Sequence, residues 1–478
     1  MQKKYGVLSL FAIMVVQGCT QLNTTASYAS VERTSVTQPK NIIMVVSDGM
    51  GPAYTTAYRN FADDPSTPNI ENVVFDDILV GNASTYPAPV SGYVTDSAAA
   101  ATALATGVKS YNGAIAVDVN KQPVESVLQR AKKLGMRTGV AVTSQINHAT
   151  PACYVAHNES RKNYNELADS FFDDRIDGKF VADVMLGGGT EFFERDDRNL
   201  VGEFIDSGYE YVDTYNKLAT LPAGANVLGL FAPVGLPAAL DDSRPHRLSY
   251  LTKNAIKHLE NDNGFFLLVE ASQVDWAGHS NDIASAMAEM DDLAATIKYL
   301  KQYVAAHPDT LVVLTADHST GGLSIGADGK YVWEPQYIQN MKASVAMVAH
   351  RMVDNSDPIA LVEEQFGFSL SDEEKAQVTA IASITDSQGR TAGLKTLLDK
   401  RTNTGWTTSG HTGVDVEVFA FGAGYDAFIG QIDNTDIANT FFKFLDQKEN
   451  ASDALEQEPV AEGDAKGCDF KSQWRCES

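Results

Sequence analysis

The chain has 478 residues, enough for two or three domains or one large α/β domain, and its hydrophobic content of 44% is that of an ordinary globular protein. It carries 62 acidic and 37 basic residues and a formal net charge of −25, which argues against nucleic acid as a partner. The same charge would repel an anionic substrate unless bound divalent cations reversed the sign locally.

The N-terminus has the features of an export signal. Two lysines near the start precede an apolar stretch, residues 7–16, which is too short to span a membrane as a helix. The sequence around Cys19 resembles a bacterial lipobox, although Gln17 is not the favoured residue at its position. Residues 1–19 are therefore predicted to be a signal peptide, with lipid attachment at Cys19 and simple cleavage as the two alternatives. Either route predicts a protein that is periplasmic, envelope-anchored or secreted.

Composition and periodicity divide the rest of the chain. Residues 20–38 are rich in Thr, Ser and Asn and are interpreted as a tether, and residues 448–478 as an acidic tail without regular structure. Residues 39–325 alternate strand-like and helix-like segments, and the strand pattern returns in 409–447. These two stretches predict an α/β core with a large, mostly parallel central sheet and helices on both faces.

Residues 326–408 differ in character and are predicted to be a mainly helical insertion in this core. Apolar residues recur at helical spacing over 339–352, and a capping box at Ser371 opens another helix.

The cysteines other than Cys19 differ in their surroundings. Cys468 and Cys476 lie close together in the polar C-terminal tail, where export makes a small disulfide loop plausible. Cys153 has no evident partner and is expected to be a small buried side chain.

Three apolar runs in the core each lead into a carboxylate. Such runs are typical of strands buried on both faces of a parallel sheet, and ligands bind at the carboxyl ends of such strands. Three acids at that edge cannot all stay ionised without a cation, so the pattern favours a metal site. The runs and their acids are 42–46 with Asp48, 265–269 with Glu270, and 311–314 with Asp317.

An alanine-rich segment over residues 93–107 predicts a helix with Thr95 or Asp96 as its N-cap and Gly107 as its stop. Ser97 then lies in the first turn, where free amides and the helix dipole favour an anion. The serine is either an ordinary residue of the cap or a nucleophile. Because Ser97 is not part of a Gly-x-Ser-x-Gly elbow, a nucleophile here would need activation by a metal.

Histidines strengthen the case for a metal site. His318 directly follows Asp317, and Asp275 and His279 are four residues apart, as on one turn of a helix. His411 stands where the chain re-enters the core. A lone histidine is more often a core or surface residue than a ligand, but sets of three His and carboxylate groups suit catalytic zinc.

Short motifs in a fixed order resemble the alkaline phosphatase family. The resemblance extends from about residue 39 to 445 apart from the insertion, and the ordered set is more specific than any one motif. The motifs are Ser47-Asp48-Gly49-Met50-Gly51, Val94-Thr95-Asp96-Ser97-Ala98-Ala99, Ala149-Thr150-Pro151-Ala152, Ser160-Arg161-Lys162, Val269-Glu270-Ala271-Ser272-Gln273-Val274-Asp275, Thr315-Ala316-Asp317-His318 and Ser409-Gly410-His411-Thr412.

The resemblance implies hydrolysis of phosphate monoesters to an alcohol and inorganic phosphate. Ser97 would be the nucleophile that forms a phosphoserine, and Arg161 would grip two phosphoryl oxygens. Two zinc ions and one magnesium ion are implied as cofactors. Their ligands would be Asp275, His279 and His411 for the first zinc, Asp48, Asp317 and His318 for the second, and Asp48, Thr150 and Glu270 for magnesium.

Two positions depart from the best-known bacterial pattern. His148 and Trp276 stand where that pattern has an aspartate and a lysine, both near the third metal and the phosphate. They indicate a subgroup of the family in which the third site has one negative charge fewer. Together with Asp96, these two residues are expected to line the substrate or to support the residues that bind it.

Other functions of related or different protein classes fit these residues less well. A phosphodiesterase or nucleotide pyrophosphatase of the same superfamily is the nearest alternative, but Arg161 suits a dianionic terminal phosphate better. A sulfatase would need Pro and Arg after the nucleophile, a phosphoglycerate mutase would bind manganese, and a non-catalytic envelope protein would not need Ser97. By analogy, the insertion is expected to overhang the site like the family's crown or to take part in a homodimer interface.

Overall fold

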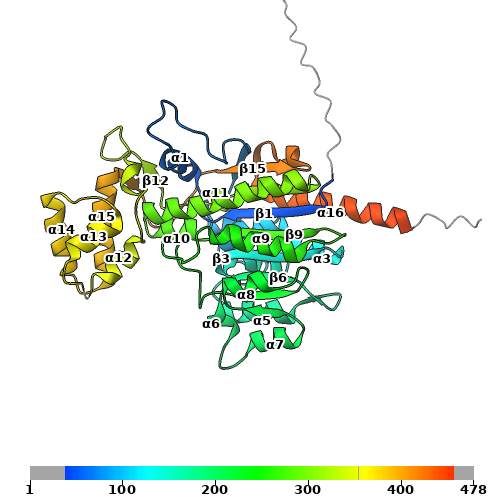
Figure 1. Ribbon diagram of the computed structural model, residues 1–478. Coiled ribbons are helices and arrows are strands. Elements are labelled where there is room, and N and C mark those ends of the chain that lie inside the picture. Colours follow the sequence, from blue (N-terminus) through cyan, green and yellow to red (C-terminus); the bar gives the residue numbers. More distant parts are fainter. Residues whose placement is uncertain (1–37, 354, 457–478) are drawn as a thin grey trace, which may run out of the picture. The chain divides into compact units, whose positions relative to one another are not determined.

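The computed structural model describes residues 38–353 and 355–456, and a central sheet of ten strands organises them (Figure 1). The strand order is β16-β2-β15-β10-β1-β9-β3-β6-β8-β7, and every neighbouring pair is parallel except the two that involve β15. The predicted fold class is confirmed. The strands are β1 (Asn41–Ser47), β2 (Leu79–Ser84), β3 (Arg137–Gln145), β6 (Val184–Gly188), β7 (Glu210–Val212), β8 (Val227–Leu230), β9 (Phe265–Ala271), β10 (Thr310–Thr315), β15 (Val416–Gly422) and β16 (Gly430–Asp433).

The register of the three central strands brings the predicted acids together. In β1, Val46 pairs with Thr315 of β10 on one side and with Glu270 of β9 on the other. Asp48 and Asp317 follow their strands within two residues of these positions. All residues of β1, β9 and β10 are buried, which explains why their sequences are continuous apolar runs rather than alternating ones.

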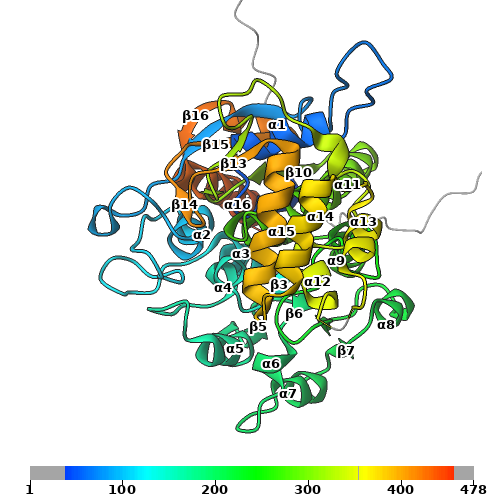
Figure 2. The same ribbon diagram turned by 90° about the vertical axis from the view of Figure 1, so that its left-hand side faces the viewer.

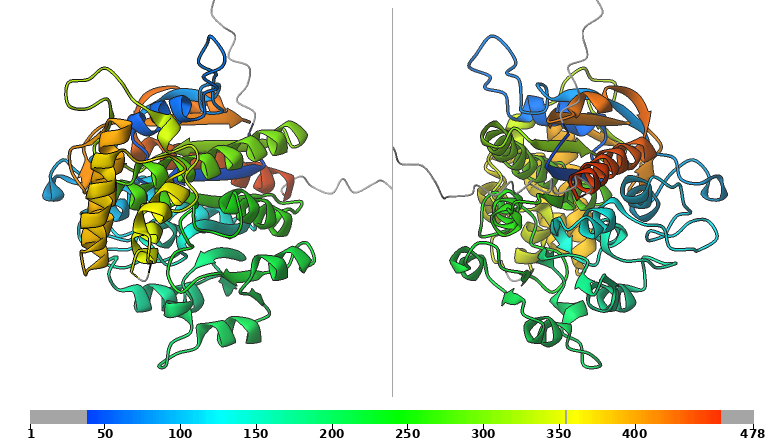
Figure 3. Two further views of the ribbon diagram at one scale, coloured as in Figure 1. Left: turned by 60° about the vertical axis from the view of Figure 1, so that its left-hand side comes forward. Right: turned by 90° about the vertical axis from the view of Figure 1, so that its right-hand side faces the viewer.

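Helices cover both faces of the sheet. Figure 3 shows α9 and α11 (green) on one face and α16 (red) on the other. The first layer packs on β3, β6, β9 and β10, and the second reaches β3 and β9 through α3 and α4. Their bounds are α1 (Pro52–Phe61), α9 (Arg247–Leu259) and α11 (Ile283–Ala306) for the first layer, and α2 (Ser97–Thr106), α3 (Val127–Lys133), α4 (Ala149–Val155) and α16 (Asn434–Glu456) for the second.

The remaining core elements are short. They connect the layers and form three small antiparallel pairs, β4 with β5, β11 with β14, and β12 with β13. Their bounds are α5 (Tyr164–Asp173), α6 (Thr190–Phe193), α7 (Leu200–Asp206), α8 (Tyr215–Thr220), α10 (Gln273–His279), β4 (Arg175–Ile176), β5 (Lys179–Phe180), β11 (Ser319–Thr320), β12 (Leu323–Ile325), β13 (Thr404–Trp406), β14 (His411–Thr412), and the 3-10 turns η1 (Pro89–Ser91) and η3 (Tyr425–Phe428).

The segment 326–408 is mostly helical, and its helices lie together next to α10 and β12 (Figure 1). The predicted helix over 339–352 begins only at Val345, because Ser344 caps it by accepting a hydrogen bond from the Met347 amide at 3.1 Å. The capping box at Ser371 is confirmed. The elements are η2 (Pro335–Tyr337), α12 (Val345–Arg351), α13 (Pro358–Phe366), α14 (Asp372–Ala382) and α15 (Ser387–Thr402).

The C-terminal helix is longer than the sequence indicated. The acidic tail was expected to lack regular structure from residue 448, but α16 continues to Glu456. Residues 448–456 include Lys, Glu, Leu and two alanines, which have high helix propensity, so the helix extends through this polar stretch.

Several predictions concern residues outside those that the structure describes. The signal peptide, the lipobox cysteine, nearly all of the tether and the Cys468–Cys476 pair fall there. Cys153 is described and fully buried, as predicted. Among the described helices none is long and apolar enough to cross a membrane.

Candidate metal centre and active site

Three completely buried carboxylates meet at the ends of the central strands. Burial, followed by the charges of Asp317 and Asp275, raises the pKa of Asp48 well above its usual range. Burial also raises the pKa of Glu270 to about 7. For Asp317 burial acts in the same direction, but the charge and the hydrogen bond of His318 lower its pKa to about 2. The cluster therefore resists full ionisation unless positive charge is supplied.

The first group of ligand-type atoms surrounds the His318 ring. Its Nε2 atom lies 3.1 Å from Asp317 Oδ2 and 3.5 Å from Asp48 Oδ1. The other oxygen of Asp317 is already used, because it accepts hydrogen bonds from the Gly49 and His318 amides, both at 3.0 Å. Neither oxygen of Asp48 accepts a hydrogen bond from any described residue. A cation among these atoms would satisfy groups that are otherwise costly to bury.

Ser97 joins this group from helix α2. It is the first residue of the helix, only 2% exposed, and its Oγ lies 3.1 Å from His318 Nε2. The predicted cap is confirmed for Asp96, which accepts a hydrogen bond from the Ala99 amide at 2.9 Å. The predicted stop is confirmed at Gly107, which has the left-handed φ of 73°. The local sequence thus places the hydroxyl at a helix N-terminus, where an anion is stabilised.

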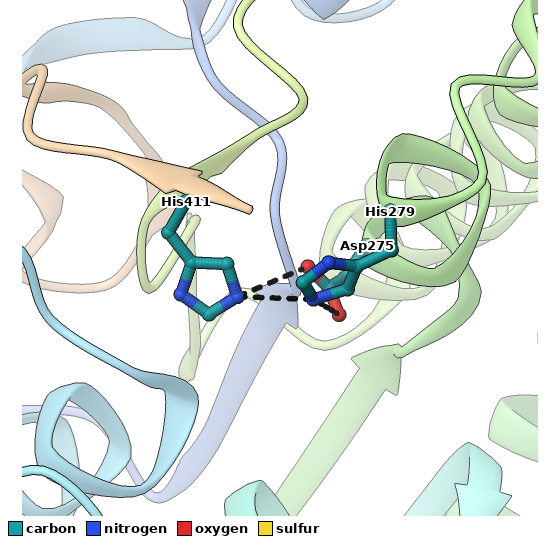
Figure 4. A group of neighbouring side chains, drawn as sticks. All are labelled: Asp275, His279 and His411. Carbon is teal, nitrogen blue, oxygen red and sulfur yellow. Dashed lines mark hydrogen bonds and ion pairs between the residues drawn. The ribbon is translucent and has the colours of Figure 1, made fainter. Parts of the chain in front are cut away.

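The second group lies nearer to solvent and consists of Asp275, His279 and His411 (Figure 4). Helix α10 places Asp275 and His279 one turn apart, and β14 supplies His411. The Nε2 atoms of the two histidines are 3.1 Å apart, and Asp275 lies 3.3 Å from His279 Nε2 and 3.6 Å from His411 Nε2.

Backbone carbonyls fix the tautomers of these histidines. His279 Nδ1 donates to the Ser409 carbonyl at 2.6 Å, and His411 Nδ1 donates to the Thr95 carbonyl at 2.9 Å. Burial, together with the charge of His318, lowers the pKa of His411 to about 4, so the ring is neutral. His411 Nε2 then carries a lone pair that faces His279 and Asp275, an arrangement that fits a cation.

A third group contains Asp48, His148 and Glu270. Ser144 Oγ donates to one oxygen of Glu270 at 3.2 Å, and the Thr150 hydroxyl lies beside the same carboxylate. Burial and the charge of Arg161 lower the pKa of His148 to about 3, so this histidine is neutral. The structure thus brings His148 into the third group.

Arg161 and Trp276 approach His148 from two sides. Arg161 donates from Nη2 to His148 Nε2 at 3.3 Å and pairs through Nη1 with Asp96 Oδ2 at 3.2 Å. The Trp276 ring meets the His148 ring edge-on, with 6.0 Å between centroids. Asp96 thus anchors the arginine while capping the helix of Ser97. The Trp276 ring contacts the site through His148.

Sequence reasoning missed several supporting groups. Thr320 Oγ1 donates to Asp275 Oδ1 and lies 3.2 Å from His318 Nδ1, so one hydroxyl contacts both the first and the second group. Its place two residues after His318 is a weak signal that could have been noticed. The carbonyls of Thr95 and Ser409 leave no signal in a sequence, since every residue has a carbonyl.

Comparison with known proteins decides the family. The family model described as alkaline phosphatase matches residues 39–447. This chain belongs to the alkaline phosphatase family. Alkaline phosphatase 3 of Bacillus subtilis (strain 168) is 45% identical over 411 residues, which cover 85% of this chain and 89% of that protein.

Solved structures support the same family. A cold-active alkaline phosphatase from a psychrophilic Shewanella is 51% identical with a TM-score of 0.80, and the match covers 85% of this chain and 99% of that one. A variant of TAB5 alkaline phosphatase with Mg bound in its M3 site is 26% identical with a TM-score of 0.64, covering 86% and 99%. The chain is therefore a hydrolase of phosphate monoesters, and the phosphodiesterase alternative is not favoured.

In protein stripped of divalent cations, Glu270 should reduce stability in a pH-dependent way. Its folded-state pKa of about 7 exceeds the value of about 4.3 in an unfolded chain, so the penalty is absent at low pH and grows as the pH rises to about 7. Glu270→Gln should therefore stabilise the stripped protein at about pH 8, by on the order of 3 kcal/mol, and change little near pH 4. Urea unfolding with a chelator at the two pH values measures this.

The exposed residue Glu210 supplies the control, and Glu210→Gln should show no such difference. With cations restored the effect of Glu270→Gln should change sign, because a ligand charge is lost. An identical effect of Glu270→Gln at both pH values in stripped protein would contradict the assignment of this carboxylate.

Proposed function

We propose that this phosphomonoesterase acts by two successive displacements through a phosphoserine at Ser97. The observation that carries the proposal is the contact of 3.1 Å between Ser97 Oγ and His318 Nε2, which joins the hydroxyl to a buried set of ligand-type atoms. Two zinc ions and one magnesium ion would be the cofactors. Their ligands would be Asp275, His279 and His411, then Asp48, Asp317 and His318, and finally Asp48, Thr150 and Glu270.

The donor sets fit these ions. Each of the first two groups combines histidine nitrogens and carboxylate oxygens, as catalytic zinc does, while the third offers mainly oxygen, as magnesium prefers. His148 makes the third group less negative than an aspartate would. When bound, the ions would offset the buried negative charge, favour the deprotonated hydroxyl of Ser97 and withdraw charge from the phosphoryl oxygens.

The chain's own residues bind and orient the substrate. Arg161 would hold two non-bridging oxygens of the phosphoryl group with its planar fork, because Asp96 and His148 already fix the guanidinium. The N-terminus of α2 would stabilise the same negative charge. His279 is 43% exposed, so the group it belongs to is open to a departing alcohol and to incoming water.

The reaction then consists of two balanced steps. Ser97 Oγ attacks phosphorus as the bond to the ester oxygen breaks, and the alcohol leaves with a proton. A water molecule next attacks the phosphoserine, the bond between phosphorus and Oγ breaks, and inorganic phosphate leaves as Ser97 regains its proton. Each step inverts the configuration at phosphorus, so the overall reaction retains it.

Removal of the nucleophile should abolish catalysis without loss of the ions. Ser97→Ala is expected to lower kcat by at least about a thousandfold, while zinc content measured by mass spectrometry stays unchanged. Acid quenching of unchanged protein during turnover of radiolabelled substrate should give a phosphopeptide containing Ser97. Ser207→Ala, which removes an exposed hydroxyl, is the control. If Ser97→Ala remained active, the phosphoserine route would be wrong.

Arg161 should distinguish monoesters from diesters. Because a diester has one anionic oxygen fewer, the unchanged protein should prefer p-nitrophenyl phosphate to bis-p-nitrophenyl phosphate. Arg161→Ala should lower kcat/KM for the monoester by about ten- to a hundredfold, the worth of one bidentate charged contact, and for the diester by much less. Equal losses on both substrates would show that the arginine does not grip the phosphoryl group.

We further propose that the chain is exported by residues 1–19, tethered by residues 20–38 and assembled as a homodimer, with lipid at Cys19 or simple cleavage as alternatives. The catalytic core would be 39–325 with 409–447, and 326–408 the crown-like insertion. Fatty-acid labelling that disappears in Cys19→Ala would establish the lipid anchor. If the unchanged chain is not labelled, simple cleavage of the signal peptide is the remaining alternative. Light scattering of purified protein should give twice the mass of one chain, and a single-chain mass would exclude the dimer.

A further inference from the structure

A short segment, Trp406–His411, joins the insertion to the exposed metal-type group. It begins in β13, which directly follows α15 of the insertion, and ends at His411 (Figure 2). On the way, the carbonyl of Ser409 accepts the hydrogen bond from His279 Nδ1. The segment therefore supplies one member of the group Asp275–His279–His411 and orients another.

The indole of Trp406 holds this segment against the core. A Cβ atom built on Gly321 would lie 2.6 Å from Cε3 of Trp406 and 2.9 Å from the carbonyl oxygen of Gly278, so ring, loop and helix α10 are in close contact. Gly278 immediately precedes His279. Only a glycine fits at position 321, which also has a left-handed φ of 78°.

Backbone hydrogen bonds complete this contact. The Gly321 amide donates to the Gly410 carbonyl at 2.8 Å, and the Gly321 carbonyl accepts from the Thr407 amide at 3.1 Å. In the neighbouring pair of strands, Thr320 of β11 pairs with His411 of β14. The position of His411 is therefore set by the same loop on which the indole rests.

Asp399 in α15 fixes the indole from the opposite side. Trp406 Nε1 donates to Asp399 Oδ1 at 3.2 Å, and both side chains are partly buried. Helix α15 packs in turn on α12 and α14. A continuous line of contacts thus runs from the body of the insertion through Asp399 and Trp406 to the two histidines.

We propose that Trp406, held by Asp399, is a positioning residue through which the insertion sets the geometry, and hence the zinc affinity, of the Asp275–His279–His411 group. The inference rests on the proposed function in that this group binds zinc. Loss of groups that orient metal ligands typically costs ten- to a hundredfold in metal affinity. The buried group of Asp48, Asp317 and His318 follows strands β1 and β10 of the central sheet instead, and it should keep its affinity.

Zinc binding to the full, metal-depleted chain, measured by competition with a chromophoric chelator, tests the proposal without reference to activity. Trp406→Ala and Asp399→Leu should each lower the affinity for one zinc ion by about ten- to a hundredfold and leave the affinity for the other unchanged. Asp399→Asn should restore most of the affinity, because its amide oxygen still accepts the indole hydrogen bond. Trp406→Phe keeps a ring on Gly321 but cannot donate a hydrogen bond to Asp399. Its zinc affinity should lie between those of Trp406→Ala and the unchanged chain.

Trp333 offers a matched control. Its Nε1 atom donates to Thr404 Oγ1 at 3.0 Å, also in β13. Trp333→Phe should therefore bind zinc as the unchanged chain does. Urea unfolding of all variants accompanies the titration. If Trp406→Ala fails to fold, the difference in zinc affinity between Asp399→Leu and Asp399→Asn tests the positioning role.

Loss of the zinc site and loss of the positioning role would give different results. If His279→Ala binds zinc with the same number and affinity as the unchanged chain, the proposed zinc site is wrong. If His279→Ala loses one zinc ion but Trp406→Ala and Asp399→Leu do not weaken it, the positioning role is wrong. Equal weakening by Trp333→Phe would also overturn it, because the effect would then be general to the insertion.

Discussion

Buried negative charge at the ends of three adjacent strands is the constraint on which the rest of this site depends. Parallel pairing of β1 with β9 and β10 sets Glu270 beside Val46 and brings Asp48 and Asp317 to the same edge. All three acids are completely removed from solvent. A fold that places them there must also place positive charge there, and His318 and Arg161 lie beside this cluster.

The two groups that combine histidine and carboxylate side chains differ in their access to water. Asp48, Asp317 and His318 are fully buried and face Ser97, whereas His279 is 43% exposed. The buried group is suited to hold the Ser97 hydroxyl in a fixed position away from bulk water. The exposed group is suited to the alcohol and the water that enter and leave. Bound cations at this edge would also resolve the conflict between a net charge of −25 and an anionic substrate.

Much of this arrangement could be predicted from the sequence because its signals are local. Apolar runs indicated the central strands, and Asp96 and Gly107 marked the two ends of the helix that begins with Ser97. The late start of α12 was missed because a serine cap overrides apolar spacing, and the length of α16 was missed because helix propensity overrides acidity.

The tertiary contacts that join the site together could not be predicted from local sequence signals. His279 and His411 are 132 residues apart and meet only through tertiary structure. Their pairing was predicted from the family resemblance rather than from spacing. Nothing in the sequence marks Trp406 or Asp399, because their importance comes from contact with the backbone of Gly321.

Crystals of the full chain, measured at wavelengths on both sides of the zinc absorption edge, would show whether zinc occupies the two groups of histidine and carboxylate side chains. One anomalous peak is expected among Asp275, His279 and His411 and a second among Asp48, Asp317 and His318, each at about 2.0–2.2 Å from histidine nitrogens and carboxylate oxygens. Absence of a bound cation from both groups in active protein would contradict this expectation, because the buried carboxylates would then have to be neutralised in some other way.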